Sequence, residues 1–282
     1  MIILSYIYYF VISSSFSLHI RWLTKKKDLQ SSEQILFTFQ IIFILFLGSL
    51  TFPFFSHFYI AGNYLYLTFL ALVCGVFGIG TNLLGIITQK HLDAGVTALV
   101  VNIYTPITIF LSSILLHEGL TAMQIFGTIL LLVAVVIVSK KHHLGSFKFD
   151  KYFLLLVLSS ALLGFLLVAE RELQITTGFS AGMIMSWGAQ AFCLGLVALF
   201  TKSKQAYTNY EVIGTGILKF FSSTSWVALV YIVGNLSLVS SITTFKVIVV
   251  FIAAAIFLGE REDIGRKIIG SVIAVLGLLL MK

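Results

Sequence analysis

Charged residues are what this sequence has least of. Asp, Glu, Lys and Arg together make up 10% of the 282 residues, whereas apolar residues make up 59%. Soluble globular domains carry charge on about a quarter of their residues, so the composition excludes a water-soluble fold. The apolar runs are continuous rather than alternating, which also excludes an outer-membrane β-barrel. We therefore expect a helical membrane protein without room for a soluble domain.

Cysteine is nearly absent, and motifs for bound cofactors are missing. Cys74 and Cys193 both lie inside apolar runs, so we interpret them as packing residues without a disulfide or a metal site. No phosphate-binding loop occurs in the sequence, which argues against direct use of ATP. The net charge of +7 is better explained by loops at a membrane surface than by a nucleic-acid partner. We therefore expect no cofactor, no metal and no nucleic acid.

The apolar part of the chain divides into ten membrane-spanning segments. A bilayer core of about 30 Å is crossed by about 20 helical residues, and short polar segments separate apolar runs of roughly this length. The short connections predict that neighbouring spans pack as antiparallel hairpins. The expected spans are residues 2–20, 34–55, 64–87, 94–116, 121–138, 152–169, 180–200, 212–233, 236–258 and 264–281.

The two halves of the chain resemble each other. The segment Val11–Ser14 in the first span matches Val157–Ser160 in the sixth. Glu118 also occupies the place in its half that Glu260 occupies in the other. Five spans per half is an odd number, so the second half enters the membrane in the opposite direction, as in many secondary transporters. We expect an all-α polytopic membrane protein with ten transmembrane helices as two inverted five-helix repeats, with a first repeat at residues 1–139, a basic linker at 140–151 and a second repeat at 152–282.

Basic loop residues collect on one side of the predicted membrane. The loops after the odd-numbered spans hold nearly all of them, whereas the other side holds only Arg171 and the terminal Lys282. Loops rich in Lys and Arg stay in the cytoplasm. The charge distribution therefore predicts that both chain ends face outside.

Two hairpins of the sequence resemble a known family. They are TALVVNIYTPITIFLSSILLHEGLTAMQIFGTILLLVAVVIV at residues 97–138 and SSITTFKVIVVFIAAAIFLGEREDIGRKIIGSVIAVLGLLL at residues 240–280. Both resemble the drug/metabolite transporter superfamily, specifically its ten-helix members built from two EamA-type units. The family pattern is a central Pro or polar residue, an acidic residue near the helix end and an early Gly in the next helix. The matching residues are Pro106, Glu118 and Gly127 in the first unit, and Glu260 and Gly270 in the second, where Ile248 replaces the proline.

The resemblance implies a multi-pass transporter of the cell membrane rather than an enzyme. The family exports or exchanges amino acids, sugars, nucleotide sugars, phosphorylated metabolites and drugs, so the resemblance does not specify the substrate. Its members are usually described with both ends in the cytoplasm, opposite to the orientation that the charges of this chain predict. The orientation of the termini is therefore left open between these two expectations.

Two lysines within the spans are the leading candidates for a substrate site. Lys246 lies about ten residues, or roughly 15 Å, into the ninth span, where a charge costs about 2.5 to 3.5 kcal/mol. We interpret it as an anchor for a carboxylate or phosphate; the alternative is a lysine paired with carbonyls or polar side chains of neighbouring helices. Lys219, in the eighth span, either shares this anion or extends to the cytoplasmic surface.

Uncharged polar residues complete the predicted lining of the site. In the repeat alignment Tyr104 falls at the level of Lys246, so the two could face each other across a pseudo-twofold axis. For any single polar residue the alternative is an interhelical hydrogen bond, worth about 0.6 kcal/mol on average. The further candidates are Asn82, Asn102, Trp226 and Thr243.

Acidic residues are expected only at the ends of spans. Glu170 and Glu172 follow the sixth span, and Glu118 and Glu260 lie at hairpin turns, where we interpret them as structural caps. The small cation exporters of the same superfamily rely on a carboxylate within their first helix. Because no Asp or Glu is expected well inside any span here, a proton-coupled exporter of lipophilic cations is disfavoured.

The sequence therefore predicts a secondary active transporter that moves a small polar metabolite, expected to be anionic, by alternating access. One alternative is an exporter of amino acids or other neutral or zwitterionic metabolites. A non-transporting membrane protein is a further alternative, although no cluster of catalytic residues supports it. The expected partners are a small-molecule substrate and the lipid bilayer, and a homodimer is left open.

Overall fold

The chain folds into α-helices joined by short turns. The computed structural model describes residues 2–26, 31–60, 62–89, 100–139, 151–201, 205–250 and 264–281, and no β-strand occurs among these residues. The helices are α1 (Ile2–Lys26), α2 (Ser31–Ser49), the 3₁₀-helix η1 (Phe52–Phe54), α3 (Tyr64–Gln89), α5 (Tyr104–Leu115), α6 (Ala122–Ser139), α7 (Lys151–Phe200), α8 (Asn209–Val233), α9 (Leu236–Thr243) and α11 (Ile264–Leu280).

Many of these helices are suited to the hydrocarbon core of a membrane. In the described part of the chain, 5 helices are long and apolar enough to cross it, and shorter apolar helices lie at Tyr104–Leu115, Ala122–Ala134, Leu236–Val250 and Ile268–Leu280. Large apolar side chains on their outer faces remain exposed, as expected where lipid is the solvent. The prediction of a helical integral membrane protein is confirmed.

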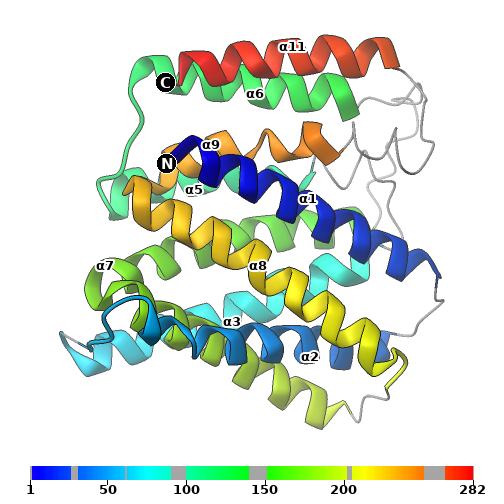
Figure 1. Ribbon diagram of the computed structural model, residues 1–282, viewed down its shortest axis with the longest axis vertical. Helices are drawn as coiled ribbons and strands as arrows, with labels where there is room; N and C mark the ends of the chain where they lie inside the picture. The colour runs from blue at the N-terminus through cyan, green and yellow to red at the C-terminus, as the bar shows by residue number, and fades with distance from the viewer. Residues whose placement is uncertain are drawn as a thin grey trace.

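The long helix α7 consists of two segments. Its 50 residues would extend about 75 Å, more than twice the thickness of a bilayer core. At Gly178 the backbone takes a φ of 77°, a conformation that glycine adopts without the steric cost of a side chain. The chain turns back at this point (Figure 1).

The first segment of α7 is longer than predicted. The sequence placed the end of the sixth span at residue 169, because three charged residues follow there. The helix instead continues through Glu170 to the break at Gly178, and Glu170 and Arg171 are buried at 5% and 8% exposure. The predicted position of Glu170 at a span end is therefore wrong. The predicted linker lies almost entirely outside the described residues, apart from Lys151, which begins α7.

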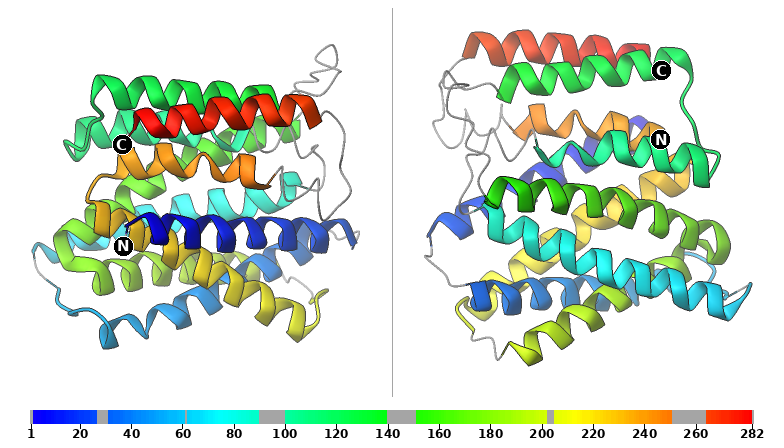
Figure 2. Two further views of the ribbon diagram at one scale, coloured as in Figure 1. Left: turned by 45° about the horizontal axis from the view of Figure 1, so that its top comes forward. Right: turned by 180° about the vertical axis from the view of Figure 1, so that it is seen from behind.

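The helices form a bundle in which distant parts of the chain are neighbours. Helix α6 pairs with α11 at one edge, α1 packs along α8, and α3 packs along α7 (Figures 1 and 2). Helix α5 lies between α7 and α9. Both chain ends lie at the same end of the bundle (Figure 1).

Glycines allow α3 to approach α7 closely. A Cβ atom at Gly75 would lie 2.7 Å from Cys193 Sγ and 3.1 Å from the carbonyl oxygen of Ala189. A Cβ at Gly78 would lie 2.4 Å from Gln190. This stretch of α3 is therefore a close-packing face, and Cys74 and Cys193 are both free thiols. Small residues at such interfaces are typical of membrane helices.

Candidate substrate-binding site

The candidate site lies where two neighbouring helices are interrupted. The first interruption precedes α5, where Asn102 and Ile103 form a turn. The Thr105 N–H donates to the carbonyl of Asn102 at 3.1 Å. This bond joins residues three positions apart, as in a 3₁₀-helix, rather than four positions apart as in an α-helix. Pro106 has no N–H with which to bond that carbonyl, and this explains the interruption.

The second interruption follows α9 and has no proline. Thr244 and Phe245 form a turn, and the chain becomes helical again at residues 246–250. Their N–H groups donate to Ser241 and Ile242, at 3.2 and 3.1 Å, in place of regular helical bonds. The Thr244 hydroxyl lies 3.1 Å from the hydroxyl of Thr105, so the two interruptions lie side by side.

Both predicted lysines lie beside these interruptions or close to them. Lys246 is the first residue of the helical segment after the second break and is partly buried. It is close enough to Lys219 of α8 for the two ammonium groups to repel each other. In the part of the chain that the structure describes, Lys246 has neither a hydrogen bond nor an ion pair. A partly buried cation without such a partner is costly inside a membrane, and binding an anion lowers that cost.

Lys219 is turned into the bundle rather than toward the membrane surface. Its Nζ atom lies 5.4 Å from the centre of the Phe16 ring of α1, within the range of a cation–π interaction. It is also attracted by the Glu170 carboxylate of α7. The sequence left two alternatives for Lys219, sharing an anion with Lys246 or extending to the cytoplasmic surface. Its position inside the bundle favours the first.

The remaining predicted residues divide between two groups. Tyr104 and Thr243 interact with each other and with Tyr9 of α1. The facing of Tyr104 and Lys246 stays a prediction, since the residue of α9 that Tyr104 contacts is Thr243. Asn102 is buried in the turn before α5 at 4% exposure, and Trp226 of α8 packs on the same apolar core as Tyr9 and Tyr104.

Asn82 belongs to a second group, centred on Glu170. The Glu170 carboxylate accepts hydrogen bonds from Ser186 Oγ at 2.7 Å and Gln190 Nε2 at 3.0 Å. Gln190 Oε1 in turn accepts one from Asn82 Nδ2 at 3.2 Å. Sequence reasoning missed Glu170, because it treated the charge cluster as the end of a span. The signal that could have found it is Gly178, the first glycine after Gly164 and the place where the helix breaks.

Several buried hydroxyl groups lack a hydrogen-bond partner within the described residues. Within the described residues, no hydrogen bond is found for Tyr6 and Ser14 of α1, Thr224 of α8 or Ser240 of α9. Buried polar groups normally pair with protein, water or ligand. These hydroxyls belong to α1, α8 and α9. The described residues contain no group of His, Cys, Asp and Glu suited to a metal ion.

The comparisons with known proteins agree with the resemblance in the sequence. The model of the EamA-like transporter family matches residues 5–140, which extend from α1 to the end of α6. This match covers slightly less than half of the chain and supports the resemblance to the drug/metabolite transporter superfamily. The members of the matched family are membrane transporters.

The fold of this chain also occurs among solved structures, of which 29 chains match it. One of them, titled only "Crystal structure of protein", shares 15% sequence identity with a TM-score of 0.73. The match covers 98% of this chain and 94% of the other. At this identity the similarity concerns the fold alone. No curated protein matches the sequence.

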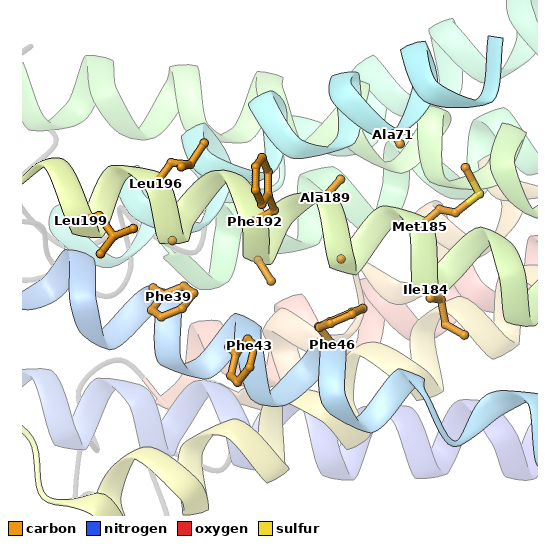
Figure 3. Close-up of a pocket in the computed structure, with 13 residues that line it drawn as sticks. Phe39, Phe43, Phe46, Ala71, Ile184, Met185, Ala189, Phe192, Leu196 and Leu199 are labelled. Atoms are coloured by element: carbon orange, nitrogen blue, oxygen red, sulfur yellow. The ribbon is translucent and has the colours of Figure 1, made fainter. Parts of the chain in front are cut away.

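The protein also has an apolar groove, which is distinct from the candidate site. Phe39, Phe43 and Phe46 of α2 line one side, and Ile184, Met185, Phe192, Leu196 and Leu199 of α7 line the other (Figure 3). Gly188 and Gly195 leave room for the rings of Phe46 and Phe39, whose atoms would lie 3.0 Å from a Cβ at either glycine. Among the described residues, no lysine or hydrogen-bonding side chain lines this groove, so its lining is unsuited to a polar metabolite.

Proposed function

We propose that the protein is a secondary active transporter that moves a small anionic metabolite across the cell membrane by alternating access. The observation that carries this proposal is Lys246, which directly follows the second helix interruption and has no hydrogen bond or ion pair among the described residues. The charge of Lys219 on α8 also acts on it. Two neighbouring cations repel each other, and each is costly inside the membrane. An anion bound between them would reduce both the repulsion and the cost of the uncompensated charge. Interrupted helices line the substrate sites of many secondary transporters.

The proposal includes the predicted architecture of ten spans in two inverted repeats, over residues 1–139 and 152–282. The five long and four shorter apolar helices support ten spans, when α7 is counted as two segments separated at Gly178. Counterparts in the two halves are also neighbours: α5 pairs with α9, and α6 with α11. The first contact is antiparallel, since Thr105 meets Thr244 and Ser112 meets Ser237. Such pairing is expected of an inverted repeat with its axis in the membrane plane.

Uptake of anions into liposomes containing the purified protein tests this function. A thermal-shift screen of carboxylates, phosphates and amino acids first selects the compounds to be assayed. We expect transport of at least one anion, and we expect Lys246→Met to weaken its binding by about tenfold or more, the effect of losing one charge-assisted contact. Transport of every accepted anion at the wild-type rate by Lys246→Met would contradict the assigned role.

Lys151 offers a matched control for this experiment. It is an exposed lysine at the start of α7, with Nζ 5.0 Å from the centre of the Tyr152 ring. Lys151→Met removes the same charge from the chain but not from the site. We therefore expect Lys151→Met to bind and transport the same anions as the wild type.

A second candidate is an exporter of zwitterionic amino acids, and Glu170 favours it. Glu170 is a buried acidic side chain on α7, and its charged form attracts Lys219 of α8. A substrate carboxylate at Lys246 and a substrate ammonium near Glu170 would use both side chains. Competition separates the candidates: simple organic anions inhibit transport strongly under the first, and only amino acids do so under the second.

A further inference from the structure

We propose that Glu170 of α7 binds the proton to which transport by this protein is coupled. This inference rests on the proposed function, because it names the ion that drives the same transport. The proton site is separate from the lysines. It belongs to the hydrogen-bonded group of Glu170, Ser186, Gln190 and Asn82, which joins α3 to the two segments of α7.

Glu170 is a buried carboxyl group without a paired cation. Its side chain is 5% exposed, within a helix that is apolar enough to cross a membrane. The neighbouring Arg171 binds Glu118 at 2.6 Å instead, and Glu170 forms no ion pair with any residue that the structure describes. An ionised carboxyl group in such a place is costly, and the uptake of a proton removes that cost. This position is therefore suited to binding a proton.

Hydrogen bonds hold the Glu170 carboxyl group in place and leave one of its oxygens available. Ser186 Oγ at 2.7 Å and Gln190 Nε2 at 3.0 Å both donate to Oε1. Gln190 Nε2 also donates to Ser186 Oγ at 3.1 Å, and Gln190 Oε1 accepts from Asn82 Nδ2 at 3.2 Å. Since the two bonds to the carboxyl group end on Oε1, they persist when Oε2 carries a proton. The group is thus held in the same place in both protonation states.

A buried acceptor without a donor lies one helical turn beyond Glu170. Gln174 is 2% exposed, and its Nε2 donates to the Val227 carbonyl at 3.4 Å, but its Oε1 has no hydrogen-bond partner among the described residues. Side chains four residues apart lie on the same face of a helix, with their Cβ atoms about 5 to 6 Å apart. An ionised carboxyl group has no hydrogen to donate to this oxygen, whereas a protonated one has. The unpartnered Gln174 oxygen therefore points to a proton on Glu170.

Few other titratable side chains face Glu170 from the helices packed around it. Lys219 of α8 acts on it through its charge, and Cys74 of α3 interacts with it. Helix α5 contributes only Tyr104, and α2 only Glu33, in its first turn. Because a cysteine thiol and a tyrosine hydroxyl lose their protons in alkaline solution, the experiments below use neutral and mildly acidic pH.

The position of Glu170 between the halves of the chain allows its protonation to be coupled to transport. Asn82 of α3 belongs to the first half, whereas Gln190, Ser186 and Glu170 belong to the second. Under alternating access the halves move relative to each other, so the surroundings of the carboxyl group change between the two states. A site whose proton affinity differs between these states lets a proton gradient shift the equilibrium between them.

An imposed pH gradient tests the coupling. Liposomes containing the purified protein are given the carboxylate or phosphate that the thermal-shift screen selects, with the inside more acidic, with the outside more acidic and without a gradient. Protein-free liposomes correct for passive diffusion of the protonated acid. We expect the wild type to accumulate the anion above its external concentration under one of the two opposite gradients, and not without a gradient.

Two substitutions on α7 assign the effect to Glu170. Glu170→Gln keeps the size of the side chain but cannot bind or release a proton, so we expect it to lose the gradient-driven accumulation. Glu172→Gln removes a carboxyl group that accepts a hydrogen bond from Tyr66 at 3.1 Å, outside the buried group, and we expect it to accumulate the anion as the wild type does.

Infrared spectroscopy detects the proton itself, because a protonated carboxyl group absorbs separately from a carboxylate. At neutral pH we expect the detergent-solubilised wild type to show this absorption. We expect Glu170→Gln to lack it and Glu172→Gln to keep it. A purely structural role of Glu170 as a permanent carboxylate would leave the absorption absent from the wild type.

The outcomes distinguish this inference from the proposed function. If the wild type transports the anion equally under every pH gradient, or if a sodium gradient alone drives accumulation, the proton site is wrong while anion transport stands. If no tested anion is transported, the proposed function fails and the coupling fails with it. Absence of the infrared absorption from the wild type overturns the proton site in either case. The wild-type measurements require no variant, so poor folding of Glu170→Gln would not prevent the test.

Discussion

Arg171 and Glu118 form a buried ion pair in which both side chains make hydrogen bonds, whereas Lys246 has no such partner among the described residues. Arg171 donates from Nε and Nη2 to Glu118 Oε1, at 2.8 and 2.6 Å. The other oxygen, Oε2, accepts from the backbone N–H of Leu236 at 2.6 Å. Glu118 thus caps the start of α9 as well as binding α7. The interpretation of Glu118 as a structural cap agrees with these contacts, although the helix that it caps belongs to the other half of the chain.

Removal of the Glu118 side chain should destabilise the protein strongly. Glu118→Ala leaves the Arg171 guanidinium buried without its carboxylate, and breaking a buried ion pair costs about 3 to 5 kcal/mol. We expect a large decrease in the thermal unfolding temperature of the detergent-solubilised protein. Arg171→Met should add little further loss to the Glu118→Ala variant, since the pair is already broken.

The neighbouring Glu172 provides the control for this measurement. It accepts a hydrogen bond from the Tyr66 hydroxyl at 3.1 Å in an exposed position. Glu172→Ala removes a carboxylate directly next to Arg171 in the sequence, and exposed substitutions change stability by about 0.5 kcal/mol or less. Equal losses at Glu118 and Glu172 would contradict the assigned role of the buried pair.

At the level of helices, α6 and α11 form a tight pair through two glycines. A Cβ at Gly127 of α6 would lie 2.7 Å from the carbonyl oxygen of Gly277 and 2.5 Å from Met281. A Cβ at Gly277 of α11 would lie 2.8 Å from the carbonyl oxygen of Gly127. Contacts this short require the backbones to move apart. The early glycine of the family pattern at Gly127 therefore serves helix packing.

Substitution of Gly127 should weaken this pair. We expect Gly127→Ala to destabilise the protein by about 1 to 3 kcal/mol, the usual cost of overpacking. Gly214 of α8 is the matched control, because no atom lies within 4 Å of a Cβ built there. Gly214→Ala should be neutral or stabilise the helix by up to about 1 kcal/mol. Thermal unfolding of the two variants side by side measures the difference, and similar effects at both positions would argue against tight α6–α11 packing.

The helices were predictable from the sequence wherever local signals define them. The predicted span at 264–281 and the helix Ile264–Leu280 nearly coincide, because an apolar run there follows a charged segment directly. The end of the sixth span was misplaced, because the partners of Glu170 and Arg171 lie 16 to 53 residues away and no local window contains them. The break at Thr244 was also hidden, since no proline or glycine marks it. Long-range pairing of polar groups therefore limited the prediction of the site.

At the scale of the whole molecule, several hydrogen bonds connect the two halves of the chain at one end of the bundle. Ser112 of α5 and Ser237 of α9 lie with their hydroxyls 2.6 Å apart, one residue from the point where Leu236 binds Glu118. Asn235 Nδ2 donates to the Gly119 carbonyl at 3.1 Å. This end also carries the chain termini (Figure 1). Under alternating access, these contacts must separate when the site opens toward that end.

A reversible cross-link between these positions should stop transport. In a protein whose Cys74 and Cys193 are replaced by alanine, Ser112→Cys and Ser237→Cys together should form a disulfide upon oxidation. We expect liposomes containing the oxidised double variant to lose transport, and a reducing agent to restore it. Each single-cysteine variant should transport under both conditions. Full transport by the cross-linked protein would exclude opening at this end.

The side-by-side interruptions of α5 and α9 also decide which groups create the electric field of the site. A helix carries about half a positive charge at its start and half a negative charge at its end. Because the two helices are antiparallel, the start of α5 at Tyr104 lies beside the end of α9 at Thr243, and their dipoles largely cancel. The backbone thus contributes little net potential there, and the sign of the field depends on the side chains of Lys219, Lys246 and Glu170.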